Sequence, residues 1–167
     1  VGGGGAGLSA AISAAQNGAK VILIEKTPLL GGNTIRAGGP YNAVDPARQA
    51  KVHAASDGAM ASIERLLKVE PKNDKHKKYQ AELKKELDAY KAEKPNRLFD
   101  CVALHILQTY DGGDYAGKID FIEKLCSESL SAAEWLENNG LVWRDEIVIC
   151  PGGLWQRAHV PQNSAGA

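Results

Sequence analysis

The sequence predicts an α/β fold in which a Rossmann-like unit, incomplete within this chain, carries a helical insert. Three observations indicate this fold. A glycine-rich run, VGGGGAG, opens a stretch with helical spacing of apolar residues. The apolar run VILI at residues 21–24 follows, and such runs are typical of a parallel strand buried on both faces. Residues 51–100 are rich in Lys and Glu and are expected to be mostly helical.

The N-terminal elements form one predicted βαβ unit. Leu8, Ile12 and Ala15 recur at helical spacing, and Asn17-Gly18 is a suitable end for this helix because glycine tolerates a left-handed cap. The run at 21–24 is the next expected strand. Only Val1 remains of the strand expected before the helix, so we expect the chain to lack most of that strand.

The later elements are predicted from apolar stripes and turn residues. Tyr79, Leu83, Leu87 and Tyr90 form one narrow stripe on a charged helix that Pro95 closes. Further helices are expected over 98–110 and 118–138. Two short strands are expected at 141–143 and 147–149, around a turn at 144–146. The predicted domains are a cofactor-binding βαβ segment over 1–50, a helical insert over 51–140 and a return segment over 141–167.

Composition excludes several classes of protein. The 167 residues carry 20 basic and 20 acidic side chains, so no charge excess favours nucleic acid or an anionic membrane. No apolar run approaches the roughly 20 residues of a membrane span. The three cysteines are predicted to be free thiols, and the four histidines show no metal-ligand spacing. The predicted location is cytoplasmic or periplasmic, with the cytoplasm favoured.

The motif Gly2-x-Gly4-x-x-Gly7 predicts dinucleotide binding. Gly2 permits a tight turn, Gly4 lets the backbone approach a pyrophosphate, and Gly7 lets helix and strand pack closely. The helix N-terminus offers free amides and a positive dipole end to the phosphates. Glu25, after the predicted strand, would accept hydrogen bonds from ribose hydroxyls and would repel the 2′-phosphate of NADP.

A second glycine cluster favours FAD over NAD. It comprises LGGNT at residues 30–34 and AGGPYN at residues 37–42. A flat isoalloxazine ring needs backbone with little side-chain bulk nearby, and amides there stabilise electron density on the reduced ring. The predicted cofactor-binding residues are Gly2, Gly4, Gly5, Ala6, Gly7, Glu25, Lys26, Gly32, Asn33, Thr34, Ala37, Gly38, Gly39 and Asn42.

These segments resemble the flavoprotein family of fumarate reductases and succinate dehydrogenases, above all the soluble members such as fumarate reductase and urocanate reductase. GGGGAG, VILIEK, GGNT and AGGPYNA carry the resemblance, and the tail WQRAHVP followed by SAGA is similar to a segment of those enzymes. It covers about residues 1–50 and 150–167, and is looser in the helical middle.

The resemblance implies an enzyme that binds FAD and reduces the activated C=C bond of an unsaturated carboxylate. Asn33 stands where succinate dehydrogenases have the histidine that carries FAD covalently, so the FAD is expected to be non-covalent. Electrons would come from another module or a separate carrier. The catalytic His and Arg residues of the family lie further along than this chain reaches, so the fragment alone is expected to be inactive.

Other interpretations stay open at this point. The same glycine motif serves other FAD-dependent dehydrogenases and oxidases, and a truncated domain could act as a helical interaction module. His105 is more readily explained as a packed or surface histidine than as a base. Arg157 and His159 would lie near the cofactor by the resemblance, but a surface role is equally compatible with the sequence.

Overall fold

The computed structural model describes residues 2–150 and 153–162. The chain forms two compact units, which are adjacent in sequence at Pro40 and Tyr41. The first unit contains helix α1 (Gly5–Gln16) and the short 3-10 helix η1 (Thr34–Arg36). The second contains five α-helices and a small sheet, so the described chain is a mixture of helix and strand.

The predicted strand at residues 21–24 is not formed. No strand is assigned there, and Ile22 and Ile24 are 85% and 70% exposed. A strand needs a neighbour to complete its ladder of backbone hydrogen bonds. Within the described part of this unit, the only bridge of strand type joins Gly4 to Gly31. The Rossmann-like architecture therefore remains a prediction, whereas the helix predicted after the glycine run is confirmed as α1.

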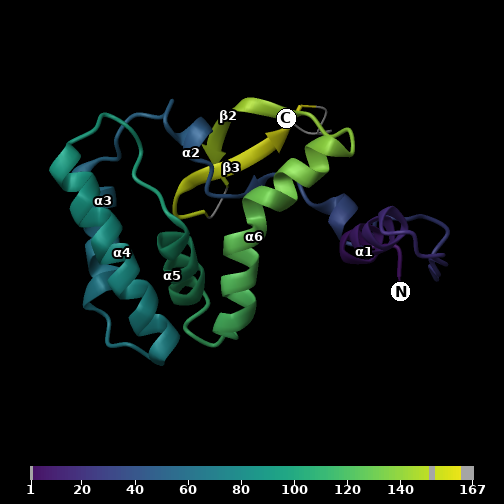
Figure 1. Ribbon diagram of the computed structural model, residues 1–167, viewed down its shortest axis with the longest axis horizontal. Helices are drawn as coiled ribbons and strands as arrows, with labels where there is room; N and C mark the ends of the chain where they lie inside the picture. Colours follow the sequence, from purple (N-terminus) through teal and green to yellow (C-terminus); the bar gives the residue numbers. More distant parts are fainter. Residues whose placement is uncertain (1, 151–152, 163–167) are drawn as a thin grey trace. The chain divides into compact units, whose positions relative to one another are not determined.

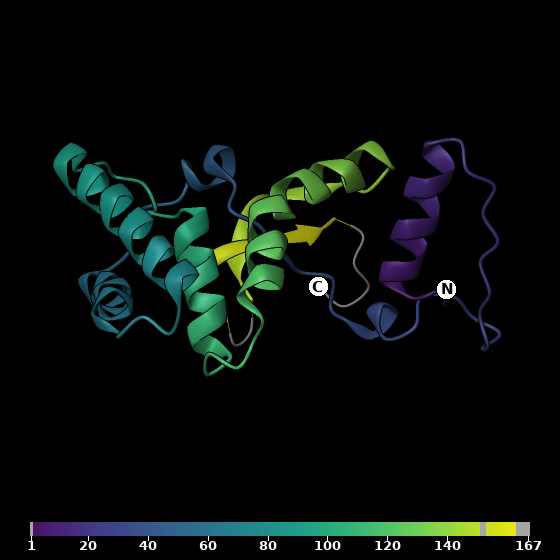
Figure 2. The same cartoon turned by 60° about the horizontal axis from the view of Figure 1, so that its bottom comes forward.

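The second unit is built on helices α2 (Pro46–Gln49), α3 (Asp57–Lys68), α4 (Asp74–Glu93), α5 (Val102–Gly112) and α6 (Ile119–Asn138). Figures 1 and 2 show α5 between α4 and α6, and α5 also packs on α3. Residues 103–108 of α5 are all buried, as expected for a helix surrounded by others. The predicted charged helix is confirmed as α4, whose Tyr79, Leu83 and Leu87 are buried. The helices predicted at 98–110 and 118–138 are confirmed as α5 and α6.

A three-stranded antiparallel sheet lies beside these helices, in the order β1-β3-β2. Its strands are β1 (Tyr41–Asn42), β2 (Trp143–Ile149) and β3 (Gln156–Pro161). The prediction of two short strands around a turn at 144–146 was wrong, because β2 runs through this segment with a register irregularity between Trp143 and Ile147. The charged residues at 144–146 are compatible with a strand because Asp145 and Glu146 are exposed.

Asn73 caps the start of α4 and also links it to Tyr110 of α5. Its side-chain oxygen accepts a hydrogen bond from the backbone amide of His76 at 2.9 Å, and its amide nitrogen donates to the Tyr110 hydroxyl at 3.1 Å. We expect Asn73→Ala to lower the free energy of unfolding by about 0.5–2 kcal/mol, the usual cost of losing such a cap. Urea denaturation would measure the loss. Asn138→Ala, at an exposed position in α6, is the control, and equal stability of the two variants would contradict the prediction.

Candidate functional site

The glycine run lies at the start of α1, as the sequence predicts. Gly4 is the N-cap residue, with φ −77° and ψ 177°, and the first helical hydrogen bond runs from the amide of Leu8 to the carbonyl of Gly4 at 2.9 Å. The amides of the first turn before Leu8 therefore have no acceptor inside the helix. Gly5 donates to Thr34 Oγ1 at 3.2 Å, while Ala6 is exposed. This helix start presents backbone donors and a positive dipole end.

Open space lies in front of Gly4 but not in front of its neighbours. A Cβ atom added at Gly4 would meet only the carbonyl oxygen of Gly31, at 4.0 Å. A Cβ at Gly3 would come within 2.4 Å of the Leu30 side chain, and one at Gly5 within 2.7 Å of Thr34 Oγ1. A side chain at Gly5 would collide with Thr34, and one at Gly3 would force the Leu30 side chain to move, whereas the space at Gly4 is available to a ligand.

The second glycine cluster contacts the first one directly. The amide of Gly31 donates to the carbonyl of Gly3 at 2.7 Å. Gly31 and Gly32 have φ values of +113° and +54°, which favour glycine, and a Cβ at Gly32 would lie 3.2 Å from the Cα of Gly4. The turn that follows residue 30 therefore packs against the start of α1, and a side chain at Gly32 would press on the backbone of Gly4.

Glu25 orients its carboxylate towards the same helix start. Oε2 accepts the amide of Gly3 at 2.7 Å, and Oε1 accepts the amide and hydroxyl of Thr27 at 2.9 and 3.0 Å. Hydrogen bonds from the backbone of Thr27 and of Gly3 lower the pKa of the Glu25 carboxyl. A carboxylate can accept about four hydrogen bonds, so Glu25 retains capacity for a further donor such as a hydroxyl.

The structure brings together some of the predicted site residues. Gly2, Gly4, Gly5, Gly32, Thr34 and Glu25 lie within one connected set of contacts with Gly3 and Gly31. The amide of Ala37 donates to the carbonyl of Thr34 at 3.1 Å, and the backbone of Lys26 contacts the carboxylate of Glu25. In the described part of the chain no contact joins Gly38 or Gly39 to this set, and Asn42 lies on β1 in the other unit. Sequence reasoning did not assign a role to Thr27 or Gly31. The position of Thr27 two residues after an acidic residue is the signal that could have identified it.

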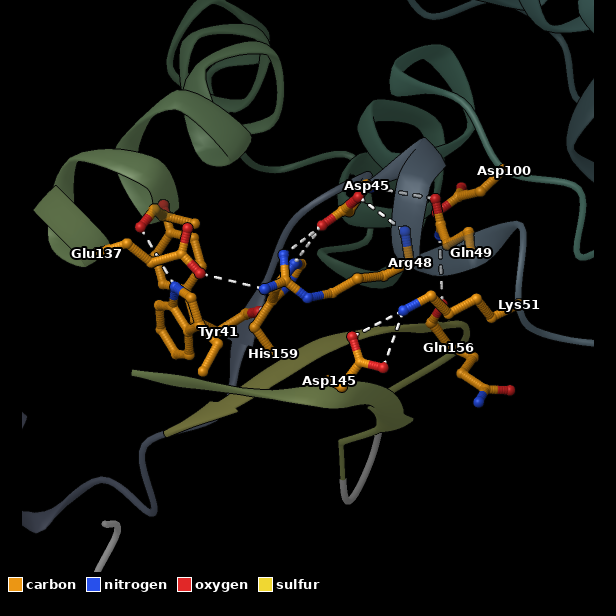
Figure 3. A network of polar contacts seen from close by, with 12 residues as sticks. Tyr41, Asp45, Arg48, Gln49, Lys51, Asp100, Glu137, Asp145, Gln156 and His159 are labelled. Atoms are coloured by element: carbon orange, nitrogen blue, oxygen red, sulfur yellow. Dashed lines mark hydrogen bonds and ion pairs between the residues drawn. The ribbon is translucent and has the colours of Figure 1, made fainter. Parts of the chain in front are cut away.

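A network of polar side chains, buried at Asp45 and His159, connects the start of α2 to the sheet in the second unit (Figure 3). Asp45 accepts hydrogen bonds from the backbone and guanidinium of Arg48, at 3.0 and 2.8 Å, and faces His159 Nε2 at 3.1 Å. Arg48 also donates to Glu137 at 3.1 Å. His159 is completely buried, and its Nδ1 faces the carbonyl of Tyr41 at 3.3 Å. The surface role left open for His159 is therefore wrong, because the residue belongs to this network.

Arg157 forms a second buried pair. Its guanidinium donates to both oxygens of Asp100, at 3.0 and 2.5 Å, and to Gln108 Oε1 at 2.8 Å. The exposed fractions of the Arg157 and Asp100 side chains are 5% and 1%. A surface role for Arg157 is thus also wrong. Since both pairs join β3 to distant segments, they position the strand.

We expect protonation of the Asp45 carboxylate to lower the stability of the protein in acid. Burial opposes its charged form, but the hydrogen bonds from Arg48 and His159 outweigh burial and lower the pKa from 3.8 to about 2. Between these values the unfolded chain binds more protons than the folded one, so stability falls as pH falls. We expect the free energy of unfolding of the unchanged protein to fall between pH 4 and pH 2. The fall should exceed that of the Asp45→Asn variant by on the order of 1–2 kcal/mol.

Acid titration followed by tryptophan fluorescence would check this difference in slope. Asp88→Asn, which alters an exposed carboxylate, should keep the slope of the unchanged protein. Parallel acid titrations of the unchanged protein and Asp45→Asn would contradict the assignment to Asp45.

All three cysteines and all four histidines lie within residues 2–150 and 153–162. The three cysteines are free, as predicted. Among these residues, His, Cys, Asp and Glu side chains do not gather in threes as a metal site would require. No helix of the described chain combines the length and the apolar character needed to cross a bilayer.

Amides at a helix start, open space at the second motif glycine and an adjacent acidic side chain are typical of dinucleotide-binding proteins. The residues present fit such a cofactor because the space at Gly4 is free of protein side chains. The chain belongs to the FAD dependent oxidoreductase family, whose model matches residues 1–111.

Several relatives match nearly the whole chain. NADH:acrylate oxidoreductase of Vibrio harveyi is 38% identical over 99% of this chain and 18% of its own length. A fumarate reductase (cytochrome) of Shewanella frigidimarina is 32% identical over 99% of this chain and 21% of its own length. Urocanate reductase of Eggerthella lenta is 26% identical over the whole chain and 20% of its own length. The chain thus spans about a fifth of these relatives, and the predicted resemblance to fumarate and urocanate reductases is confirmed.

Proposed function

We propose that this chain supplies the FAD-binding segment of an oxidoreductase that reduces the C=C bond of an unsaturated carboxylate. The observation that carries the proposal is the open space at Gly4, in front of amides at the start of α1. The FAD diphosphate would accept hydrogen bonds from these amides, with the helix dipole favouring its negative charge. Gly2 would provide the turn and Gly7 the close packing of the helix.

Glu25 would hold the adenosine ribose. Its carboxylate is already oriented by Gly3 and Thr27, so a ribose hydroxyl could donate to it without a rearrangement of the loop. A negative charge at this place disfavours the 2′-phosphate of NADP. The contact between the two glycine clusters supports a role for Gly32 and Thr34 in the same site.

The isoalloxazine ring would lie near the second cluster, which includes Asn33, the segment 37–39 and Asn42. Asn33 has no nucleophilic imidazole, and non-covalent FAD follows from that. Once reduced by the electron donor, bound flavin would supply a hydride to the substrate. The residues of this chain would bind and orient the cofactor, and we assign no catalytic residue among them.

The substrate class follows from the names of the relatives. Acrylate, fumarate and urocanate each combine a C=C bond with a carboxylate, and the proposed substrate shares this chemistry. The names of two relatives include NADH and cytochrome, and we infer a comparable electron-donor module or separate carrier for this protein. We retain the cytoplasm as the proposed location.

Purification of the full-length protein tests the proposal directly. We expect flavin absorbance in the native protein and release of FAD into the supernatant after acid denaturation, because the bond is non-covalent. The flavin-loaded protein should oxidise a reduced viologen dye when acrylate, fumarate or urocanate is added. A protein that takes up no FAD on titration would contradict the proposal, and flavin that stays with the precipitate would contradict non-covalent binding.

A further inference from the structure

A cavity of about 210 Å³ lies within the unit of residues 41–163. It is separate from the Asp45–His159 network, and helix α5 provides much of its wall. Its main lining residues are Asn42, His105, Gln108, Thr109, Leu154 and Arg157. The volume is about seven times the share of one water molecule in the liquid, so it suits a small planar group.

His105 is a buried polar side chain without a partner. It is only 7% exposed, and its Nδ1 atom has no hydrogen bond in the structure. Burial and the charge of Arg157 lower its pKa to about 3, so the imidazole is neutral at physiological pH. Leaving a buried polar atom such as Nδ1 without a hydrogen bond costs free energy. This residue therefore favours an occupant that forms hydrogen bonds.

Gln108 offers hydrogen-bond donors in the same place. Its side-chain oxygen accepts from Arg157 Nη1 at 2.8 Å, which fixes the orientation of the amide. With the oxygen held in this way, the NH₂ group is the part of the amide that can donate to an occupant of the cavity. Asp100 pairs with Arg157 on the other edge of the guanidinium, so the cation is held in position by two partners.

We propose that this cavity binds the carbonyl or carboxylate oxygens of a small planar ligand, with Gln108, His105 and Asn42 as hydrogen-bond partners. The available donors and the neighbouring guanidinium favour an acceptor-rich group and disfavour a cation. Leu154 contributes an apolar contact for the face of such a group.

Two ligands share this chemistry. The pyrimidine edge of the flavin carries two carbonyl oxygens, and a substrate of the proposed class carries a carboxylate. The identity of either ligand rests on the proposed function. The existence of the donors in the cavity is independent of that function.

Gln108→Glu in the full-length protein is the test. The variant keeps an oxygen for Arg157 but replaces the NH₂ donors by an acceptor with negative charge. Titration calorimetry would measure FAD binding to the apoprotein and fumarate binding to the flavin-loaded protein. We expect one of the two affinities to fall about tenfold or more, as for the loss of a hydrogen bond to a group left unpaired. Gln16→Glu, at the far end of α1 from its glycine-rich start, is the control with the same change of charge.

The outcomes separate the ligands. A fall confined to FAD assigns the cavity to the flavin carbonyls, and a fall confined to fumarate assigns it to a carboxylate. Affinities within twofold of the control for both ligands would overturn the inference, even when FAD binds and the proposed function holds. A protein that binds fumarate in the apo form through Gln108 but takes up no FAD would support the cavity and contradict the FAD proposal.

A second measurement covers the case in which the variant does not fold. Histidine-selective ¹⁵N labelling of the unchanged protein, with His105→Phe used for assignment, reports the ring nitrogens of His105. We expect their resonances to shift when FAD or fumarate is added. Unchanged resonances with both ligands bound would overturn the inference.

Discussion

Replacing Gly4 by valine is expected to lower the affinity for FAD by about 10- to 100-fold, because overpacking of a filled site costs roughly 1–3 kcal/mol. The fold should survive. The backbone of Gly4 is extended, with φ −77° and ψ 177°, a conformation that any residue adopts, and the added Cβ would have only Gly31 O near it, at 4.0 Å. The new side chain would instead occupy the space proposed for the diphosphate.

Titration of the apoprotein with FAD, followed by quenching of flavin fluorescence, would measure this loss. Gly58→Val is the matched control, because a Cβ at Gly58 meets nothing within 4 Å and Gly58 lies near the start of α3, a helix in the other unit. A Gly4→Val protein that binds FAD as tightly as the Gly58→Val protein would remove the main support for the proposed site.

Arg157→Leu is expected to lower the free energy of unfolding by about 3–5 kcal/mol, the cost of leaving one member of a buried ion pair alone. Asp100 would keep the hydrogen bonds from Gln49 and from the amide of Cys101, but its charge would lose the guanidinium that now contacts both oxygens. Because Arg157 lies on β3 and Asp100 precedes α5, the loss should loosen the attachment of the sheet to the helices.

The second substitution Asp100→Asn in the same protein should restore part of the stability, because it removes the uncompensated charge. Urea denaturation of the two variants would measure the recovery. Lys84→Leu, which breaks the exposed pair of Lys84 with Asp88, should change stability by only about 0.5 kcal/mol. A loss for Arg157→Leu no larger than for Lys84→Leu would contradict the role of the buried pair.

The sequence predicted the elements that depend on local signals. The helix α1 follows from its glycine start and its Asn17-Gly18 end, and α4 follows from the spacing of Tyr79, Leu83 and Leu87. The strand expected at 21–24 depends on a neighbouring strand, which no spacing within the run can provide. The turn expected at 144–146 was wrong because the pairing with β3 decides the conformation there.

In the candidate site, too, local sequence signals were readable and contacts between distant residues were not. The glycines and Glu25 were predictable because each has a known use in dinucleotide binding. The buried pairs were not, since Asp100 and Arg157 are 57 residues apart and Asp45 and His159 are 114 apart. Likewise, the missing partner of His105 could not be seen without the packing around α5.

The contact between the two glycine clusters makes them one structural unit. A methyl group at Gly32 would press on the Cα of Gly4, although 28 positions of sequence separate them. Substitutions at the two glycines should therefore be non-additive in a double-mutant cycle. Transplanting the first glycine run into another scaffold should fail to transfer nucleotide binding unless the later turn travels with it.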